Sequence, residues 1–176
     1  LCLMTAQIAK GGYKITPKIL TDDNQLTSEQ VKKAMQTTSL NEFNIPLYDD
    51  PKNIKIIQEA MFSSTNELRG TSYKSRIDDP MYQFAGKTGT AQVKRISKRE
   101  RELDLKTFQI PYKERDHALY VAFGPYKNPR YSLSIIVEHG GSGSSAAAPM
   151  ATKLFKLIVD RHQHRKQLPD YKEFNI

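Results

Sequence analysis

Hydrophobic residues recur at helical spacing in three parts of the chain. The first helix is predicted over residues 1–10 and ended by the glycine pair that follows, and its apolar face comprises Leu1, Met4 and Ile8. A second helix is predicted after Asp50, because its carboxylate can cap the first turn and the next residue is a proline. This helix is predicted to end near Gly70, with an apolar stripe of Ile54, Ile57 and Met61.

The third predicted helix follows a glycine- and serine-rich turn and runs to Asp160, where the apolar pattern stops. Ser144 or Ser145 is predicted to cap it. Its predicted buried stripe comprises Met150, Ala151, Leu154, Phe155 and Ile158. Residues 1–160 are expected to form one folded part, and residues 161–176 a polar, frayed tail. A further short helix is expected over residues 28–35.

Two segments alternate in the manner of β-strands, residues 118–123 and 131–137, and a turn rich in proline and asparagine joins them. In the second strand one face comprises Tyr131, Leu133, Ile135 and Val137. In the first, bulky residues alternate with Ala118, Tyr120 and Ala122. Since neither strand has a charged face, helices are expected to cover both faces of the sheet.

A third strand, predicted over residues 82–93, carries polar groups inside an apolar run. Gly89 weakens the strand and indicates a place where a ligand approaches the backbone. Lys87 adds a positive charge beside it, and Thr88 and Thr90 add hydroxyls. This edge is therefore predicted to bind an extended ligand that bears a carboxylate, by main-chain pairing.

Composition limits the function classes. The chain has 176 residues, enough for one domain, and a net charge of +8. Much of the excess lies in residues 94–115 and 161–172, and acidic residues interrupt the first block, which is typical of a solvated segment. Nucleic-acid binding is therefore not expected, and contact with anionic lipid head groups or an acidic wall polymer is the better alternative.

Two further features concern the compartment and the start of the chain. Cys2 is the single cysteine, which excludes an internal disulfide, and it is predicted to be a small core residue. No stretch has the length of a membrane span, and the first residues do not resemble a signal peptide. Because a helical pattern is already under way at Leu1, the chain is expected to be part of a longer protein.

The string from Lys87 to Thr90 resembles the third active-site motif of the penicillin-recognising serine enzymes, which follows Ser-x-x-Lys and Ser-x-Asn motifs. Residues 3–12, 118–126 and 136–141 also resemble the class B penicillin-binding proteins. Gln92-Val93 and the turn at residues 138–141 are more similar to the elongation type, penicillin-binding protein 2, than to the division type. The likeness extends over about residues 1–160.

This resemblance implies an α+β fold, in which helices flank an antiparallel sheet, as in the serine β-lactamases, with three of the family's five strands in this chain. It implies the C-terminal part of a D,D-transpeptidase that cross-links peptidoglycan stem peptides ending in D-Ala-D-Ala. β-Lactams would acylate the same serine. Other cell-wall synthesis proteins are expected partners, and the expected location is the periplasmic face of the bacterial inner membrane, with the membrane anchor upstream of Leu1. No metal or cofactor is implied.

The residues of the motif receive roles from the same resemblance. Lys87 would set the field around the catalytic serine and bind the ligand carboxylate. The hydroxyls of Thr88 and Thr90 would bind that carboxylate, and Gly89 would let the ligand lie against the strand. The backbone N–H of Thr90 would complete the oxyanion hole. The strand at residues 131–137 would lack its family neighbour, so poor stability of the isolated chain is expected.

The chain contains no Ser-x-x-Lys, so the nucleophile is expected before Leu1 and the isolated chain is expected to be inactive. The nearest spacing is Thr71-Ser72-Tyr73-Lys74, which begins with threonine. Ser-x-Asn occurs at residues 39–41 and 64–66, but in the family the true triplet precedes the segment that residues 1–12 resemble. Both are therefore interpreted as chance matches. The alternative to an enzyme is a non-catalytic module of the same fold that binds peptides or assembles with other proteins.

Other patterns in the chain are interpreted as structural. Gly86-Lys87-Thr88 ends like a phosphate-binding loop, but Met81 stands where that loop needs its first glycine. His117 and His139 have no serine or cysteine partner at a recognisable spacing. His162 and His164 lie in a charged segment and are weak candidates for metal ligands.

Overall fold

The computed structural model describes residues 1–17, 45–95, 102–103 and 105–167, and the predicted helix over residues 28–35 lies outside them. The α-helices within these residues are α1 (Cys2–Ala9), α3 (Pro51–Asn66) and α5 (Ala148–Lys166). The strands are β1 (Ala85–Ala91), β2 (His117–Gly124) and β3 (Tyr131–Val137). Shorter turns are η1 (Tyr73–Ser75), η2 (Thr107–Gln109), η3 (Tyr112–Glu114) and the π-helical η4 (Gly143–Ala147).

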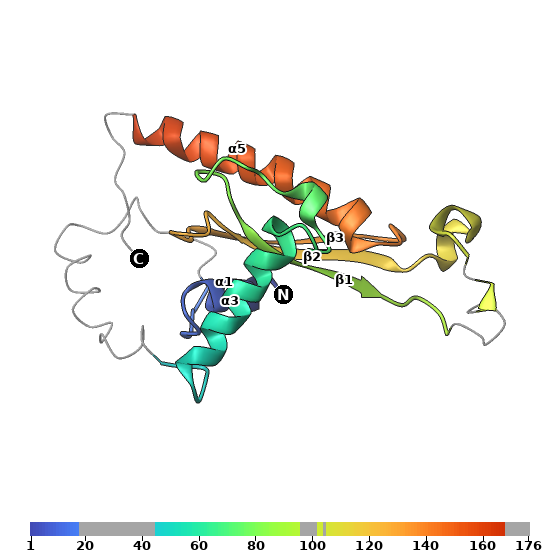
Figure 1. The fold of residues 1–176 in the computed structure, drawn as a ribbon, viewed down its shortest axis with the longest axis horizontal. Helices are drawn as coiled ribbons and strands as arrows, with labels where there is room; N and C mark the ends of the chain where they lie inside the picture. Colours follow the sequence, from blue (N-terminus) through green and yellow to red (C-terminus); the bar gives the residue numbers. More distant parts are fainter. Residues whose placement is uncertain (18–44, 96–101, 104, 168–176) are drawn as a thin grey trace, which may run out of the picture.

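The three strands form an antiparallel sheet in the order β1-β2-β3. Lys87 lies opposite Val121, which in turn lies opposite Ser134. Helix α5 crosses one face of the sheet, while α1 and α3 lie on the other (Figure 1). The predicted strands, and the prediction of an α+β fold with helices on both faces, are confirmed.

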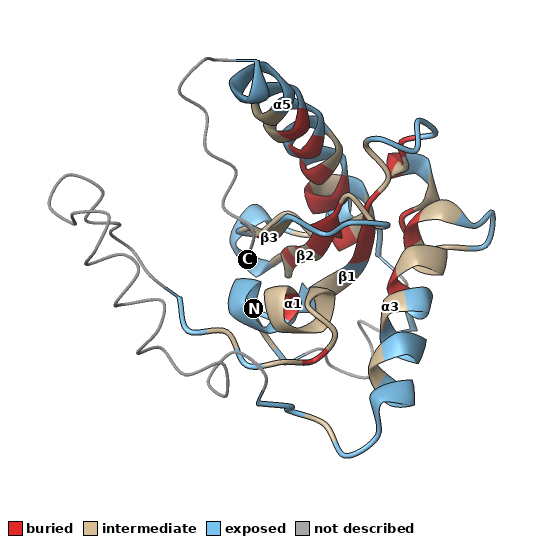
Figure 2. Ribbon diagram, turned by 90° about the vertical axis from the view of Figure 1, so that its left-hand side faces the viewer, coloured by how far each residue is buried: buried red, intermediate tan, exposed pale blue. Residues whose placement is uncertain are grey.

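The core divides between the two faces of the sheet (Figure 2). On the α5 side, alternate residues of β2 join Phe84 and Phe155, whose rings stack with centroids 4.8 Å apart. On the other side, Phe123 and Met61 form a smaller cluster with Ala85. The alternation predicted for β2 therefore directs Ala118, Tyr120 and Ala122 into the larger cluster.

Helix α3 begins as its sequence predicts. The side chain of Asp50 accepts a hydrogen bond of 2.8 Å from the backbone N–H of Lys52, and Pro51 occupies the first turn. Its end differs from the prediction, because the helix stops at Asn66 rather than near Gly70. The segment that follows instead folds back against the last turn of α3. This places residues 70–72 beside the candidate site.

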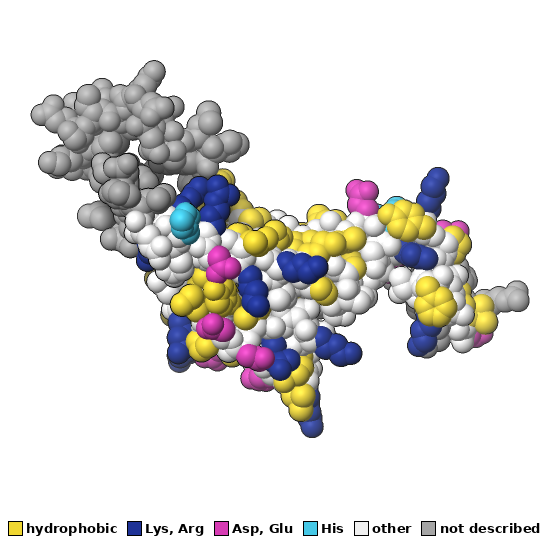
Figure 3. Space-filling model, turned by 90° about the horizontal axis from the view of Figure 1, so that it is seen from above, with side chains coloured by type: hydrophobic (Ala, Val, Ile, Leu, Met, Phe, Trp, Pro, Cys, Tyr) yellow, Lys and Arg dark blue, Asp and Glu magenta, His cyan; other side chains and the backbone are white. Residues whose placement is uncertain are grey.

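The predicted stripe of α5 is confirmed at Ala151 and Phe155 and wrong at Met150 and Leu154. Buried residues of this helix are Ala148, Ala151, Phe155 and Val159, whereas Met150 and Leu154 are exposed. The small alanine side chains let the start of α5 approach the sheet closely, and this turns the bulkier neighbouring stripe outward. Seen from the α5 side, hydrophobic side chains accordingly reach the surface among lysines and arginines (Figure 3).

The two ends of α5 also differ from the prediction. Ser144 and Ser145 do not cap it, because both lie within η4, and the N-cap position belongs to Ala147. Residues 161–166, predicted to be frayed, continue the helix to Lys166. Within the described residues, no helix combines the length and the apolar character that crossing a bilayer requires.

Helix α1 ends at the predicted glycine pair, and both Gly11 and Gly12 have φ of 84°. The prediction that Cys2 is a core residue is wrong, because Cys2 is exposed. Its Sγ lies 3.5 Å from the carbonyl oxygen of Ser132 on β3. Thr5 is the buried residue of α1, so the helix rests on the sheet by a face other than its most apolar one.

Candidate functional site

The C-terminal end of α3 covers the start of the edge of β1 that faces away from β2. The side-chain amide of Asn66 donates a hydrogen bond of 2.9 Å to the carbonyl oxygen of Phe84. The hydroxyl of Thr65 lies 3.5 Å from the carbonyl oxygen of Gly86. Both carbonyls that precede Lys87 on this edge are therefore covered by side chains of α3.

The same edge continues past α3 at Thr88 and Thr90. In an antiparallel ladder alternate residues direct their backbone N–H and C=O away from the partner strand, so both threonines direct theirs as Gly86 does. The carbonyl oxygen of Thr88 accepts a hydrogen bond of 2.9 Å from Lys87 Nζ. The predicted ligand-binding residues thus lie on the part of the edge that α3 does not cover.

Lys87 lies beside a groove between α1, α3 and the sheet, with a volume of about 610 Å³. The apolar side chains that line it are Met4, Ile8, Ile57, Met61 and Val121. Its polar side chains include those of Ser64, Glu67, Arg69, Thr71 and Lys87. The polar lining of this mostly apolar groove therefore combines two cations and several hydroxyls with one carboxylate, that of Glu67. The excess of positive charge suits an anionic group on an otherwise apolar ligand.

The short helix η4, which precedes α5, packs against β1 at Gly89. A Cβ atom added to Gly143 would lie 2.7 Å from the carbonyl oxygen of Gly89, and it would also meet the carbonyl oxygen of Leu119. The backbone of η4 therefore packs directly on β1 and β2, and the lack of a side chain at Gly143 permits this packing. Residues 142–145 thus belong to the surroundings of the site, which the sequence prediction missed.

A network of buried hydroxyls beneath Gly86 was also missed. The phenolic oxygen of Tyr120 lies 2.9 Å from Thr65 Oγ1 and 3.1 Å from Ser72 Oγ. Burial raises the pKa of Tyr120 above the ordinary 10.0, although its hydrogen bonds with Ser72 and Thr65 act to lower it. The phenol therefore stays protonated at neutral pH and joins β2 to α3 and to the segment before η1.

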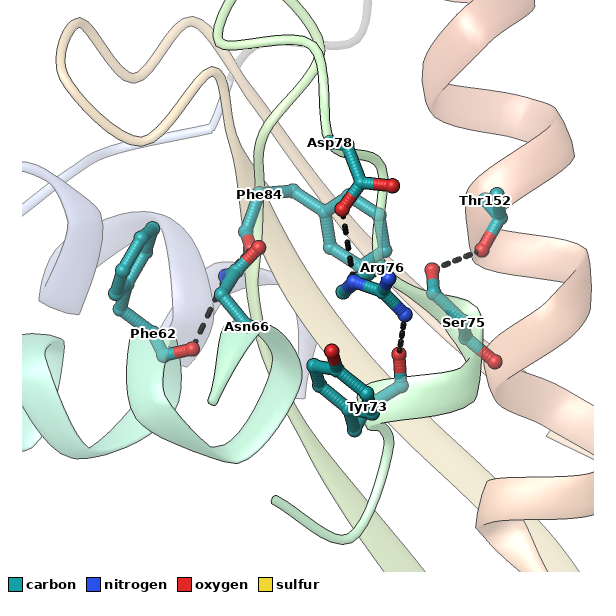
Figure 4. A network of polar contacts seen from close by, with 8 residues as sticks. All are labelled: Phe62, Asn66, Tyr73, Ser75, Arg76, Asp78, Phe84 and Thr152. Carbon is teal, nitrogen blue, oxygen red and sulfur yellow. Dashed lines mark hydrogen bonds and ion pairs between the residues drawn. The ribbon is translucent and has the colours of Figure 1, made fainter. Parts of the chain in front are cut away.

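The segment between α3 and β1 is fixed by further polar contacts (Figure 4). Arg76 Nε donates to Asp78 Oδ1 at 2.8 Å, and its guanidinium lies 4.0 Å from the ring centroid of Tyr73. The hydroxyl of Thr152 on α5 donates to the carbonyl oxygen of Ser75. These contacts hold residues 71–78 between α3 and α5 rather than leaving them as a free loop.

The two serine patterns that the structure describes have structural roles. In Thr71-Ser72-Tyr73-Lys74, Ser72 is buried and its hydroxyl donates to the carbonyl oxygen of Ser64 at 3.0 Å. In the triplet at residues 64–66, Thr65 and Asn66 bind the backbone and Tyr120 as described above. The triplet at residues 39–41 lies outside the described residues.

His117, at the start of β2, and His139, just after β3, also have structural roles. The backbone N–H of His139, whose φ is 55°, donates to His117 Nδ1 at 3.0 Å, and its own Nδ1 lies 3.0 Å from the carbonyl oxygen of Arg115. The rings of His139 and Tyr112 are 5.1 Å apart. In the part of the chain that the structure describes, no group of three or more His, Cys, Asp or Glu side chains could hold a metal ion.

Comparisons with known proteins agree on one family. Residues 1–156 match the family described as penicillin binding protein transpeptidase domain. The peptidoglycan D,D-transpeptidase MrdA of Haemophilus influenzae is 29% identical over 182 aligned residues, which cover 96% of this chain and 27% of that protein. MrdA of Acinetobacter baumannii is 47% identical over 93 residues, covering 52% of this chain and 12% of its own length.

Solved structures give the same result. PBP2 of Helicobacter pylori, in its complex with MreC, superposes with a TM-score of 0.63 at 26% identity, covering 92% of this chain and 24% of that one. PBP2 of Pseudomonas aeruginosa, in complex with WCK 5153, gives a TM-score of 0.58 at 29% identity, covering 87% and 28%. The predicted resemblance to penicillin-binding protein 2 is confirmed. The chain spans about a quarter of the length of the H. influenzae relative, at 27%.

Proposed function

Because the chain belongs to the family of penicillin-binding protein transpeptidase domains, we propose that residues 1–160 form the C-terminal part of a peptidoglycan D,D-transpeptidase. The observation that carries this proposal is the position of Lys87, Thr88 and Thr90. They lie on the uncovered part of a strand edge, and Lys87 lines an apolar groove. An extended peptide ending in a carboxylate fits such an edge, because main-chain pairing and a nearby cation can act on it together.

In the proposed reaction, a serine outside this chain attacks the penultimate D-alanine carbonyl of a stem peptide. D-Alanine leaves, and the amine of a neighbouring stem then takes the acyl group from the serine. Lys87 sets the electrostatic field and binds the substrate carboxylate together with the hydroxyls of Thr88 and Thr90. The N–H of Thr90 donates to the oxyanion, a contact whose loss typically costs about a hundredfold to a thousandfold in rate. β-Lactams acylate the same serine.

The proposed setting follows from the relatives. MrdA proteins are named peptidoglycan D,D-transpeptidases, and one PBP2 structure is a complex with MreC. We propose that the protein acts at the periplasmic face of the inner membrane, with an anchor upstream of Leu1, and meets other cell-wall synthesis proteins there. The second candidate is a non-catalytic module of the same fold that binds peptides or assembles with other proteins. The residues upstream of Leu1 discriminate between the two, because a Ser-x-x-Lys motif there supports the enzyme and its absence there supports the module.

Intact-mass measurement before and after incubation with penicillin tests the proposal. The protein purified from its source is expected to be larger than these 176 residues and to gain the mass of one penicillin, while the isolated chain gains none. Lys87→Ala in the complete protein is expected to slow the acylation at least about a hundredfold, a loss on the scale of one preorganised charged or oxyanion contact. A source protein that takes up no penicillin would favour the non-catalytic module.

A further inference from the structure

A third threonine, Thr71, lies beside β1 although it is distant from this strand in the sequence. Thr71 Oγ1 lies 3.5 Å from Thr88 Oγ1 and 3.2 Å from Ser64 Oγ. Thr88 Oγ1 in turn lies 3.4 Å from Lys87 Nζ. Ser64, Thr71 and Lys87 all line the groove described above, and Thr71 is exposed. A continuous row of hydroxyls therefore connects the end of α3 to the lysine of the proposed substrate site.

The chain places Thr71 in this row by two short-range devices. Gly70 presses against the last turn of α3, where an added Cβ would lie 2.6 Å from the carbonyl oxygen of Ser63. Ser72 is anchored on the other side, because both its N–H and its hydroxyl donate to the carbonyl oxygen of Ser64 at 3.0 Å. With both neighbours held, the backbone of Thr71 is fixed relative to the end of α3, and from there its hydroxyl reaches Thr88 Oγ1 on β1.

The position of Thr71 affects which partner the hydroxyl of Thr88 can donate to. A threonine hydroxyl has one proton to donate and two lone pairs that accept. If Thr71 donates to Thr88 Oγ1, the proton of Thr88 is left free to bind an anion, and Ser64 can donate to Thr71 in the same sense. Successive hydrogen bonds of one direction strengthen one another. The ammonium of Lys87 can only donate, and it also donates to Thr88 Oγ1. When Thr71 donates as well, both lone pairs of Thr88 Oγ1 accept, and the proton of Thr88 is directed to a third partner.

We propose that Thr71 is a positioning residue, a role that rests on the proposed function. It directs the Thr88 hydroxyl toward the carboxylate of the bound stem peptide or penicillin. Thr71 acts through Thr88 and makes no contact with the reacting carbonyl. Its effect is therefore specific to ligands that carry a free carboxylate, and it disappears when Thr88 has no hydroxyl.

A double-mutant cycle in the complete protein tests this role through the second-order rate of acylation by penicillin. Thr71→Val keeps the shape of the side chain and removes the hydroxyl, and it is expected to slow acylation about threefold to tenfold, which corresponds to one neutral hydrogen bond. Thr71→Ser keeps the hydroxyl and is expected to stay within about twofold of the wild type. In a Thr88→Val background, Thr71→Val is expected to change the rate less than about twofold.

A penicillin methyl ester provides the control, since it lacks the carboxylate. Thr71→Val is expected to leave its slower acylation unchanged. Additive losses in the cycle, equal losses with acid and ester, or no loss with the acid would each overturn the role of Thr71. A wild-type protein that takes up no penicillin would instead overturn the proposed function itself, so the two failures are distinguishable. Because Thr71 is exposed, its variants are expected to fold, and Thr71→Ala repeats the measurement with a smaller side chain.

Discussion

The hydroxyl of Thr65 on α3 and the phenol of Tyr120 on β2 meet at 2.9 Å inside the protein. Both side chains are fully buried, with an exposed fraction of 0%. Their contact lies under Gly86, the residue before Lys87, so the position of β1 over the core depends on this pair. The geometry of an exposed edge is thus set by groups that no ligand touches.

Gly86→Ala is expected to destabilise the protein by about 1–3 kcal/mol, because the added methyl group would collide with the buried phenol of Tyr120. Urea unfolding measures the change. Gly89→Ala in the same strand is the matched control, since its methyl would meet Leu119 Cβ at 3.2 Å, and less than about 1 kcal/mol is expected. Equal effects at the two glycines would contradict the role given to Tyr120.

Tyr120→Phe is expected to reduce the free energy of unfolding by about 1 kcal/mol near neutral pH, since Thr65 and Ser72 lose a partner. The folded-state pKa of Tyr120 is raised above 10.0 by burial, so its stabilising effect is complete below pH 10.0 and is lost as the pH rises through the folded value. The advantage of the wild type over the variant should therefore shrink above pH 10.0 in urea unfolding. A difference that stays constant with pH would refute this.

Asp50→Ala is expected to cost about 1 kcal/mol, because it removes the acceptor for the first turn of α3. Thermal unfolding should show most of the loss restored in Asp50→Asn, whose amide oxygen also accepts. Asp49→Ala changes the same charge one residue earlier, on an exposed side chain, and is expected to stay within about 0.5 kcal/mol. If Asp49 and Asp50 behaved alike, net charge rather than capping would explain the loss.

Gly143→Ala is expected to slow penicillin acylation of the complete protein about tenfold, on the scale of one misplaced oxyanion or carboxylate contact. The added methyl would meet backbone atoms of Gly89, which cannot rotate away, so β1 must shift. Gly140→Ala is the control, because its methyl would meet the side chain of Val137. Similar rates for Gly143→Ala and the wild type would show that η4 does not support the strand.

The sequence predicts those parts of the fold that local patterns determine. Asp50-Pro51 marks the start of α3, and alternation marks β2 and β3, because capping and the two-residue strand period act over a few residues. The burial of α5 is not predictable in the same way. Ala151 and Phe155 are buried as predicted, but Met150 and Leu154 are not, because small alanines at the start of the helix permit close contact with the sheet.

Some residues of the candidate site can likewise be predicted from local patterns, and others cannot. Lys87 to Thr90 is visible as polar residues and glycine within one strand, so its position on the edge follows from the sequence. Thr71 and Tyr120 are not visible, because their proximity to the strand arises only after α3, the segment that follows it and β2 have packed together. Gly70 and Gly143 were recognisable only as turn residues, although each marks a close backbone approach.

The cover that Asn66 and Thr65 give to the first carbonyls of β1 also bears on solubility. An open strand edge can pair with the edge of another molecule and begin aggregation. Here an intruding strand could not run along the whole of β1, because the end of α3 blocks it before Lys87. The edge that remains is short and starts beside the positive charge of Lys87. Under the proposed function, this arrangement favours a short peptide with a negative end over a long neutral strand.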